Sequence, residues 1–201
     1  MNTIVVCSVH RSPKVMPHIM DLNPTYSFTG DYPGKACGYY RCHMGHATGI
    51  AAYMTDDIAL MLEDDCIPNS TKDWRGAIEE GKKLIENEIC DVVCLHGRGE
   101  EEIPKKFRFS YYGRFEWAKQ PKEHYTIQGS LAYLINRKAA WELRHFDPWW
   151  KFTALDNLLW SPRFNFMLLR DEDYTQPHFI HGCGIEESLM PKVPNQKYSR
   201  V

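Results

Sequence analysis

An apolar run that ends in three consecutive carboxylates constrains this chain more than any other stretch. Residues 58–62 read Ile-Ala-Leu-Met-Leu, and Glu63, Asp64 and Asp65 follow directly. A short continuous apolar run is typical of a buried parallel strand, and ligands of open α/β sheets bind beyond the carboxyl ends of the strands. Adjacent carboxylates repel one another, and a hard divalent cation offsets that repulsion. The stretch therefore predicts a Mg2+ or Mn2+ site at a strand tip, with a solvated acidic turn as the alternative.

Strand and helix patterns alternate along most of the chain. Further strands are expected at residues 3–9, 91–95, 125–135 and 164–169, and helices at 38–54, 74–85, 137–145 and 155–160. Ser70 or Thr71 can cap the second of these helices, and residues 23–35, rich in Pro, Gly, Tyr and Asp, are expected to be a loop. The alternation predicts an α/β fold with a mainly parallel central sheet and helices on both faces. With 43% hydrophobic residues, the chain fits a single domain over residues 1–201.

Composition narrows the classes of protein. The formal net charge of -2 names no partner by itself. The first residues lack the basic, apolar and small-residue segments of a signal peptide, and no apolar run reaches about 18 residues. We therefore expect a soluble, intracellular protein without a transmembrane segment.

The seven cysteines are odd in number, which predicts reduced thiols. Four residues form a cluster that could bind a structural zinc ion: Cys37, Cys42, His43 and His46. Their spacing is not one of the usual zinc-finger spacings. The alternative is a helix whose Cys and His side chains pack or face a cleft.

Several short motifs occur between about residue 3 and residue 188. They are Val6-Cys-Ser-Val-His-Arg11, Gly38-x4-His43, Ala59-Leu-Met-Leu-Glu-Asp-Asp65, Gly129-Ser-Leu-Ala-Tyr-Leu-Ile135 with Ala139-Ala140, then Asp156 and Pro177-x3-His181. In this order they resemble glycosyltransferase family 25, which includes lipooligosaccharide and collagen sugar transferases. The resemblance implies a GT-A-like fold and a nucleotide-sugar donor, with a UDP-sugar expected. Cys42 departs from the family, which usually has Ser before the histidine, and residues 97–124 match no part of it.

A metal that neutralises charge on a diphosphate leaving group would suit this chemistry. Glu63 and Asp65 are expected to hold it as Mn2+ or Mg2+, with Asp65 as the first choice. His178 and His181 are candidates for a late ligand, and at an odd separation along a strand they point to opposite faces. We prefer His181 because it falls on the family's motif and precedes Gly182. A surface or satisfied histidine is the alternative.

Two acids are candidates for catalysis. Asp64 is expected to face the sugar or a hydrogen-bond donor behind the metal ligands, and Asp156 could take the acceptor's proton or orient its hydroxyl, or could instead cap a helix. If the resemblance holds, the donor is contacted by four further residues, Ser8, Arg11, His43 and Gly129. The alternative for Arg11 is an ordinary surface arginine, and the alternative for His43 is a histidine packed within its helix.

Residues 97–124 show no clear period and are expected to be an acceptor-side loop or lid. Between residues 105 and 122 bases alternate with aromatic side chains, which is typical of a nucleic-acid surface and also of a sugar-binding lid. The expected acceptor is a lipopolysaccharide or oligosaccharide hydroxyl, or a 5-hydroxymethylcytosine flipped out of phage-type DNA. A solvated loop that binds no polymer is the alternative. The expected location is the cytoplasm of a bacterium or of a phage-infected host.

Two other classes of function would use the same residues differently. A metal-dependent phosphohydrolase or nuclease would use the same carboxylates, but it would need more acids on other strand tips and an activated water. A zinc-stabilised binding module would make the Cys and His cluster its centre and leave the Glu-Asp-Asp sequence without a role. We rank both below a glycosyltransferase.

Overall fold

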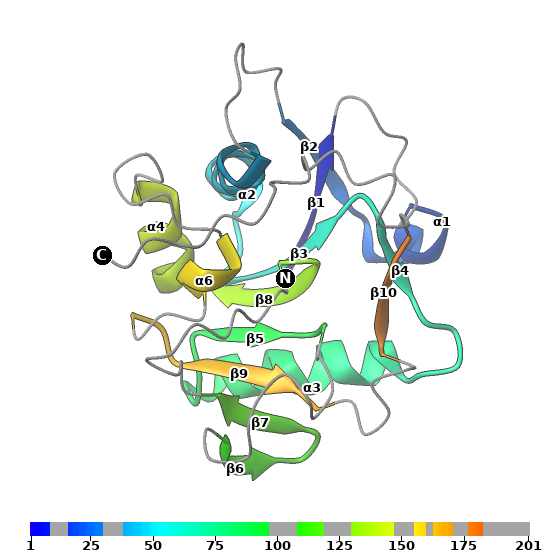
Figure 1. Ribbon diagram of the computed structural model, residues 1–201, viewed down its shortest axis with the longest axis vertical. Helices are drawn as coiled ribbons and strands as arrows, with labels where there is room; N and C mark the ends of the chain where they lie inside the picture. The colour runs from blue at the N-terminus through cyan, green and yellow to red at the C-terminus, as the bar shows by residue number, and fades with distance from the viewer. Residues whose placement is uncertain are drawn as a thin grey trace, which may run out of the picture.

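The computed structural model describes residues 1–8, 16–29, 38–96, 108–118, 130–146, 155–159, 163–170 and 177–182. Within these residues, eight strands form one sheet in the order β2-β1-β3-β8-β5-β9-β7-β6 (Figure 1). Their bounds are Asn2–Ser8 (β1), Thr25–Thr29 (β2), Ile58–Glu63 (β3), Val92–Cys94 (β5), Arg108–Tyr112 (β6), Phe115–Ala118 (β7), Ala132–Asn136 (β8) and Phe166–Leu169 (β9).

The sheet is mixed, with one predominant direction. Strand β1 is parallel to β2 and β3, and β5 is parallel to β9. Strand β8 lies antiparallel between β3 and β5, and the hairpin β6–β7 adds antiparallel to β9. Among the described strands, β7 and β8 therefore run one way and the other six run the opposite way.

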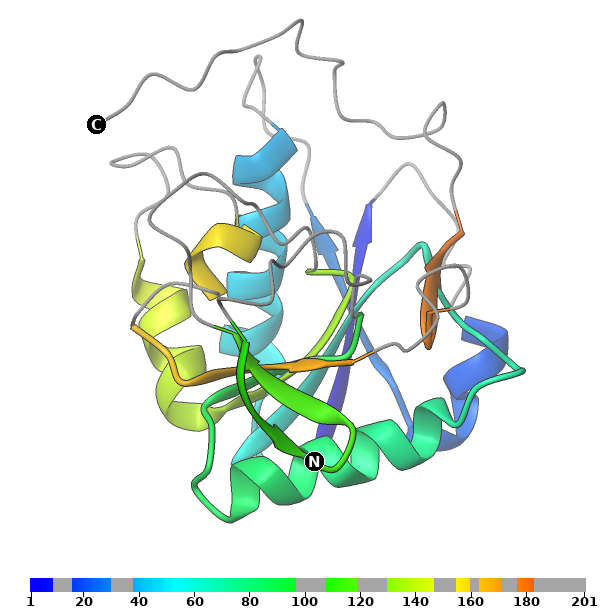
Figure 2. The same ribbon diagram turned by 60° about the horizontal axis from the view of Figure 1, so that its bottom comes forward.

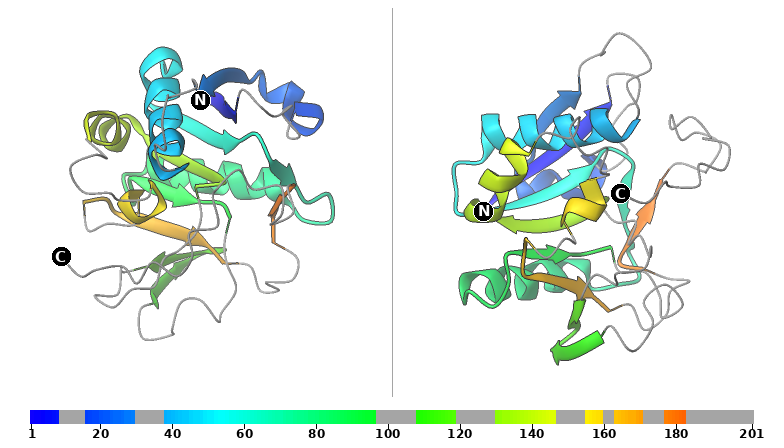
Figure 3. Two further views of the ribbon diagram at one scale, coloured as in Figure 1. Left: turned by 45° about the horizontal axis from the view of Figure 1, so that its top comes forward. Right: turned by 60° about the vertical axis from the view of Figure 1, so that its left-hand side comes forward.

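Helices cover both faces of the sheet. Helices α2 (Gly38–Tyr53), α4 (Arg137–His145) and α6 (Leu155–Leu159) lie on one face, and α1 (Met16–Ile19) and α3 (Trp74–Glu86) lie on the other (Figures 2 and 3). Ala59 and Met61 of β3 pack into the first core, and Ile58, Leu60 and Leu62 pack into the second. Because both faces are buried, β3 is apolar at every position from Ile58 to Leu62 and does not alternate. The predicted fold class, an α/β fold with a mainly parallel sheet and helices on both faces, is confirmed.

A second sheet, of two strands, places residues 179–181 beside the segment that follows β3. Strand β4 (Cys66–Pro68) pairs antiparallel with β10 (Phe179–His181), so that His181 lies opposite Cys66. The Gly182 amide donates a hydrogen bond of 2.5 Å to the Asp65 carbonyl. A Cβ at Gly182 would meet the Asp65 carbonyl oxygen at 2.9 Å and Ile67 Cδ1 at 2.7 Å, so only glycine allows this approach.

Three local predictions were wrong. Residues 25–29, expected as loop, form the edge strand β2, because the Pro and Gly residues around them suggested a turn while their partner β1 is distant in sequence. Helix α3 is capped by Asp73, whose Oδ1 accepts from the Gly76 amide at 2.9 Å, and not by Ser70 or Thr71. Residues 108–118, expected as irregular, form a β-hairpin that turns at Gly113, where φ is +57°.

The hairpin is tied to α3 by one of the bases of the basic and aromatic segment. Arg114 Nη2 lies 2.9 Å from Glu80 Oε1 and 3.1 Å from Asp73 Oδ2. The next residue, Phe115, is fully buried. The remainder of the segment either lies outside the described residues or is described for its backbone alone. Its role as an acceptor-side lid, and the single domain over residues 1–201, stay predictions.

Candidate functional site

The three acids lie where β3 leaves the sheet, and hydrogen bonds to both neighbouring segments fix their backbone. The Glu63 amide donates to the Leu131 carbonyl and the Asp64 amide to the Val6 carbonyl, both at 3.0 Å. Asp64 is 1% exposed and Asp65 is 7% exposed. Burial of this degree does not fit a solvated acidic turn. Ionised carboxylates remain in a protein interior only where partners compensate their desolvation.

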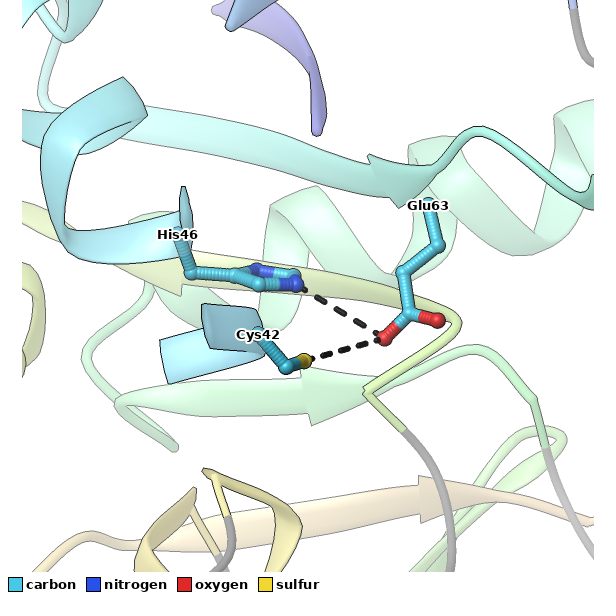
Figure 4. Close-up of side chains that lie close together, drawn as sticks. All are labelled: Cys42, His46 and Glu63. Atoms are coloured by element: carbon cyan, nitrogen blue, oxygen red, sulfur yellow. Dashed lines mark hydrogen bonds and ion pairs between the residues drawn. The ribbon is translucent and has the colours of Figure 1, made fainter. Parts of the chain in front are cut away.

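The Glu63 side chain points back over the sheet toward α2 (Figure 4). Its Oε1 accepts a hydrogen bond of 2.5 Å from Ser130 Oγ and lies 3.7 Å from Cys42 Sγ and 3.6 Å from His46 Nε2. The second carboxylate oxygen points away from Cys42 and His46 (Figure 4). One sulfur, one nitrogen and one oxygen atom, from Cys42, His46 and Glu63, thus lie within 4.8 Å of one another.

Helix α2 presents Cys42 and His46 together because residues four apart lie on the same helical face. The helix can approach the sheet closely at Gly49, where a Cβ would meet Ile4 Cγ2 at 3.0 Å and Ser27 Cβ at 3.1 Å. The helix position and the tip of β3 together bring the three side chains to one point. Gly49 thus allows α2 to pack closely against the sheet.

Tyr133 of β8 contacts the His46 ring through a hydrogen bond and by stacking. Its hydroxyl lies 2.8 Å from His46 Nδ1, and the two rings stack with centroids 5.5 Å apart. Burial, followed by the charges of Cys42 and Glu63, raises the pKa of the Tyr133 hydroxyl well above its ordinary value. The hydroxyl is therefore neutral, and its oxygen can accept a hydrogen bond from Nδ1–H.

The tip of β3 is a region of negative potential. Burial raises the pKa of Glu63, but its interactions with nearby His46 and with Ser130 outweigh burial, and the pKa lies below its ordinary value. Burial first, then the charges of Glu63 and Asp65, raise the pKa of the Cys66 thiol well above its ordinary value. Three adjacent acidic side chains, Glu63, Asp64 and Asp65, thus gather at this tip beside a neutral Cys66, an arrangement that favours a cation.

The structure brings two of the predicted metal ligands near each other by their backbones. Asp65 follows β3 directly, and His181 pairs with Cys66, the next residue after Asp65. The direction of the His181 side chain lies outside what the structure describes. His178, the other histidine considered, is buried, and its carbonyl accepts from the Asn69 amide at 2.9 Å.

The other predicted site residues are placed in part. Ser8 ends β1, and Asp156 lies in α6, but neither side chain is described. Arg11 and Gly129 lie outside the described residues. His43 is fully buried on α2 and packs against Phe146, with ring centroids 5.8 Å apart.

The grouping of Cys42 and His46 with Glu63 was missed. Both α2 residues stood out as part of a possible zinc cluster with Cys37 and His43, but no partner on the acidic strand was assigned to them. The available signal was their i, i+4 spacing, which separates them from His43 and places them on one helical face.

No described helix is long and apolar enough to cross a membrane. No protein-family model matches the sequence, and no curated protein matches it. Membership of glycosyltransferase family 25 therefore stays a prediction.

Solved structures with the same arrangement include a glycosyltransferase involved in the glycosylation of the major capsid of PBCV-1. It aligns with a TM-score of 0.53 and 11% identity, covering 92% of this chain and 96% of that chain. A197 from STIV aligns with a TM-score of 0.49 and 13% identity over 92% of this chain and 95% of that chain. HddC from Yersinia pseudotuberculosis aligns with a TM-score of 0.43 and 13% identity, covering 90% and 73%. The likeness to the first of these shows that the chain shares its α/β, GT-A-like fold.

Proposed function

We propose that this protein is a metal-dependent glycosyltransferase that moves a sugar from a nucleotide sugar, a UDP-sugar, to a hydroxyl acceptor. The observation that carries the proposal is the placement of buried Asp64 and Asp65 at the carboxyl end of β3 on a GT-A-like sheet. Ligands of such sheets bind beyond this edge. The negative potential of the strand tip supports a cation there.

The ion is Mn2+ or Mg2+, held by Asp65, Glu63 and His181. Carboxylate oxygens and an imidazole nitrogen suit both ions. The pairing of β10 with β4 places His181 opposite Cys66, the residue that follows Asp65. The second oxygen of Glu63 points away from α2 and can ligate this ion (Figure 4). When bound, the ion would neutralise the negative charge that develops on the diphosphate leaving group.

The protein's own residues bind and orient the two substrates. Asp64 faces the transferred sugar, and Asp156 accepts the acceptor's proton or orients its hydroxyl. Three residues contact the donor in this proposal, namely Ser8, Arg11 and Gly129, whereas fully buried His43 fits the alternative of a packed helix histidine. The resemblance in sequence supports these roles.

The acceptor is a saccharide hydroxyl, as in lipopolysaccharide or an oligosaccharide, or a 5-hydroxymethylcytosine in phage-type DNA. The bases and aromatics of residues 105–122 support the second acceptor. Arg114 is held by Glu80 and Asp73, so the other bases of the segment would have to meet the phosphates. Binding of duplex DNA that weakens steeply with salt would be expected in that case.

The deciding experiment offers the full chain a panel of UDP-sugars with Mn2+ and three acceptors: an oligosaccharide, unmodified DNA and 5-hydroxymethylcytosine DNA. Mass analysis of the digested products identifies which acceptor gains a sugar. Cleavage of phosphate esters in these substrates, with no sugar transferred or released from any donor, would favour the phosphohydrolase or nuclease and contradict the proposal.

A further inference from the structure

The group of Cys42, His46 and Glu63 contains a thiol, which a Mg2+ or Mn2+ site does not need. Hard ions of this kind take oxygen ligands, whereas a thiolate selects softer ions such as Zn2+. Cys42 and His46 come from one helical face and Glu63 from the strand opposite. Three donors from two elements therefore converge on one point between α2 and β3 (Figure 4).

Two of the three separations between the donor atoms match those around one tetrahedral ion. Zn–S distances of about 2.3 Å and Zn–O distances of about 2.0–2.2 Å place a sulfur and an oxygen about 3.5 Å apart at a tetrahedral angle. Cys42 Sγ lies 3.7 Å from Glu63 Oε1, and His46 Nε2 lies 3.6 Å from the same oxygen. The latter distance is too long for a hydrogen bond.

The His46 ring supplies an independent sign of a ligand. The residue is fully buried, and no group in the described part of the chain forms a hydrogen bond with Nε2, the atom that faces the cluster. Nδ1 meets the Tyr133 hydroxyl at 2.8 Å. Metal-binding histidines characteristically donate their other ring N–H to an oxygen in this way, which fixes the tautomer and turns the bare nitrogen to the metal.

We propose that Cys42, His46 and Glu63 bind a zinc ion that joins α2 to the end of β3. Binding displaces the Cys42 thiol proton to solvent, and Glu63 ligates through Oε1 while Ser130 holds that carboxylate in place. The three protein ligands leave one coordination position for water, and the Glu63 side chain is 20% exposed. This inference goes beyond the proposed function and does not depend on it.

Cobalt substitution tests the site without any assay of activity. The full chain is stripped with a chelator under reducing conditions and titrated with Co2+. We expect one equivalent of tetrahedral Co2+, seen by its visible d–d bands, with a near-ultraviolet band that reports a thiolate ligand. Zn2+ should displace the cobalt and erase both bands, and native mass spectrometry should find one zinc ion per chain.

Matched variants assign the sulfur. Cys42→Ser should lose the thiolate band, whereas Cys90→Ala, which removes a buried free cysteine from the opposite core, should keep it. Tyr133→Phe keeps the ligands but removes the hydroxyl from Nδ1, and should weaken zinc affinity about 10–100-fold. Circular dichroism of each apo variant checks that it folds.

Two results would overturn the site: no thiolate band in the wild-type protein, or a band that survives in folded Cys42→Ser. An Asp65→Ala protein separates this inference from the proposed function, because it should keep the cobalt spectrum while losing sugar transfer. Loss of zinc binding alongside intact transfer in Cys42→Ser would uphold both ideas, and transfer absent in every protein would reject only the proposed function.

Discussion

The carboxylates at the tip of β3 and those on α3 meet their partners in opposite surroundings. Glu63 Oε1 lies in a mostly buried cluster with fully buried His46, whereas Glu80 meets Arg114 at 2.9 Å with side chains that are 43% and 29% exposed. An exposed pair contributes little to stability because water and salt screen it. A buried carboxylate is costly unless a partner or ligand compensates it. The acids of β3 therefore depend on buried partners to offset their desolvation, whereas the exposed acids of α3 remain in contact with water.

The largest expected effect comes from removing a buried acid. Asp65→Ala should abolish sugar transfer and leave the protein folded, because a metal-ligand carboxylate contributes charge at the diphosphate and little to core packing. The apo protein should keep or gain stability, since one repelling charge is lost. Donor turnover measured beside thermal melting checks this. Activity within a few-fold of wild type would place the metal elsewhere.

The second-largest expected effect is on ligand binding, which should depend on the acids at the tip of β3 and not on those of α3. UDP should raise the melting temperature only when Mn2+ or Mg2+ is present, because a ligand that binds the folded state stabilises it by mass action. The rise should disappear in Asp65→Ala and persist in Glu80→Gln. Equal stabilisation by UDP in excess chelator would count against a metal held by Glu63 and Asp65.

The pH dependence of stability should also separate the regions. Because the folded-state pKa of Glu63 lies below its ordinary value, its contribution is full above the unfolded pKa of about 4.5 and is lost as pH falls through the folded value. In metal-free protein, Glu63→Gln should cost about 1–3 kcal/mol at neutral pH, as expected for a broken buried hydrogen-bond partner. Denaturant unfolding of both proteins across this acid range should show the difference shrinking. A difference that stays constant down to low pH would show that the carboxylate charge is not involved.

Local sequence was sufficient for the strand tip but not for its partners. The unbroken apolar run of β3 follows from burial on both faces, and the acids that end it lie at the sheet edge where ligands bind. Cys42 is 21 residues from Glu63, and their approach depends on how closely α2 packs at Gly49. Edge strand β2 escaped prediction for a similar reason, since its pairing with β1 is a tertiary contact.

The smallest expected effect on stability comes from changing an exposed acid of α3. Glu80→Gln removes the charge that meets Arg114 but keeps the side chain's size. The free energy of unfolding should fall by only about 0.2–1 kcal/mol at low salt, and by less as salt screens the pair. Release of the sugar from the donor should not change, because Glu80 is not among the residues assigned to the metal or the donor, and its pair with Arg114 joins the hairpin β6–β7 to α3.

Denaturant unfolding at two ionic strengths checks this, with Glu86→Gln as the matched control. Glu86 pairs with Lys82 within α3 at 3.4 Å and ties no second element, so its loss should have a still smaller effect. A loss of several kcal/mol in Glu80→Gln, independent of salt, would show that the hairpin depends on this pair as strongly as the strand tip depends on its buried partners. The acids of β3 and those of α3 would then differ only in whether they bind the metal and UDP, and not in how much burial matters to their contribution to stability.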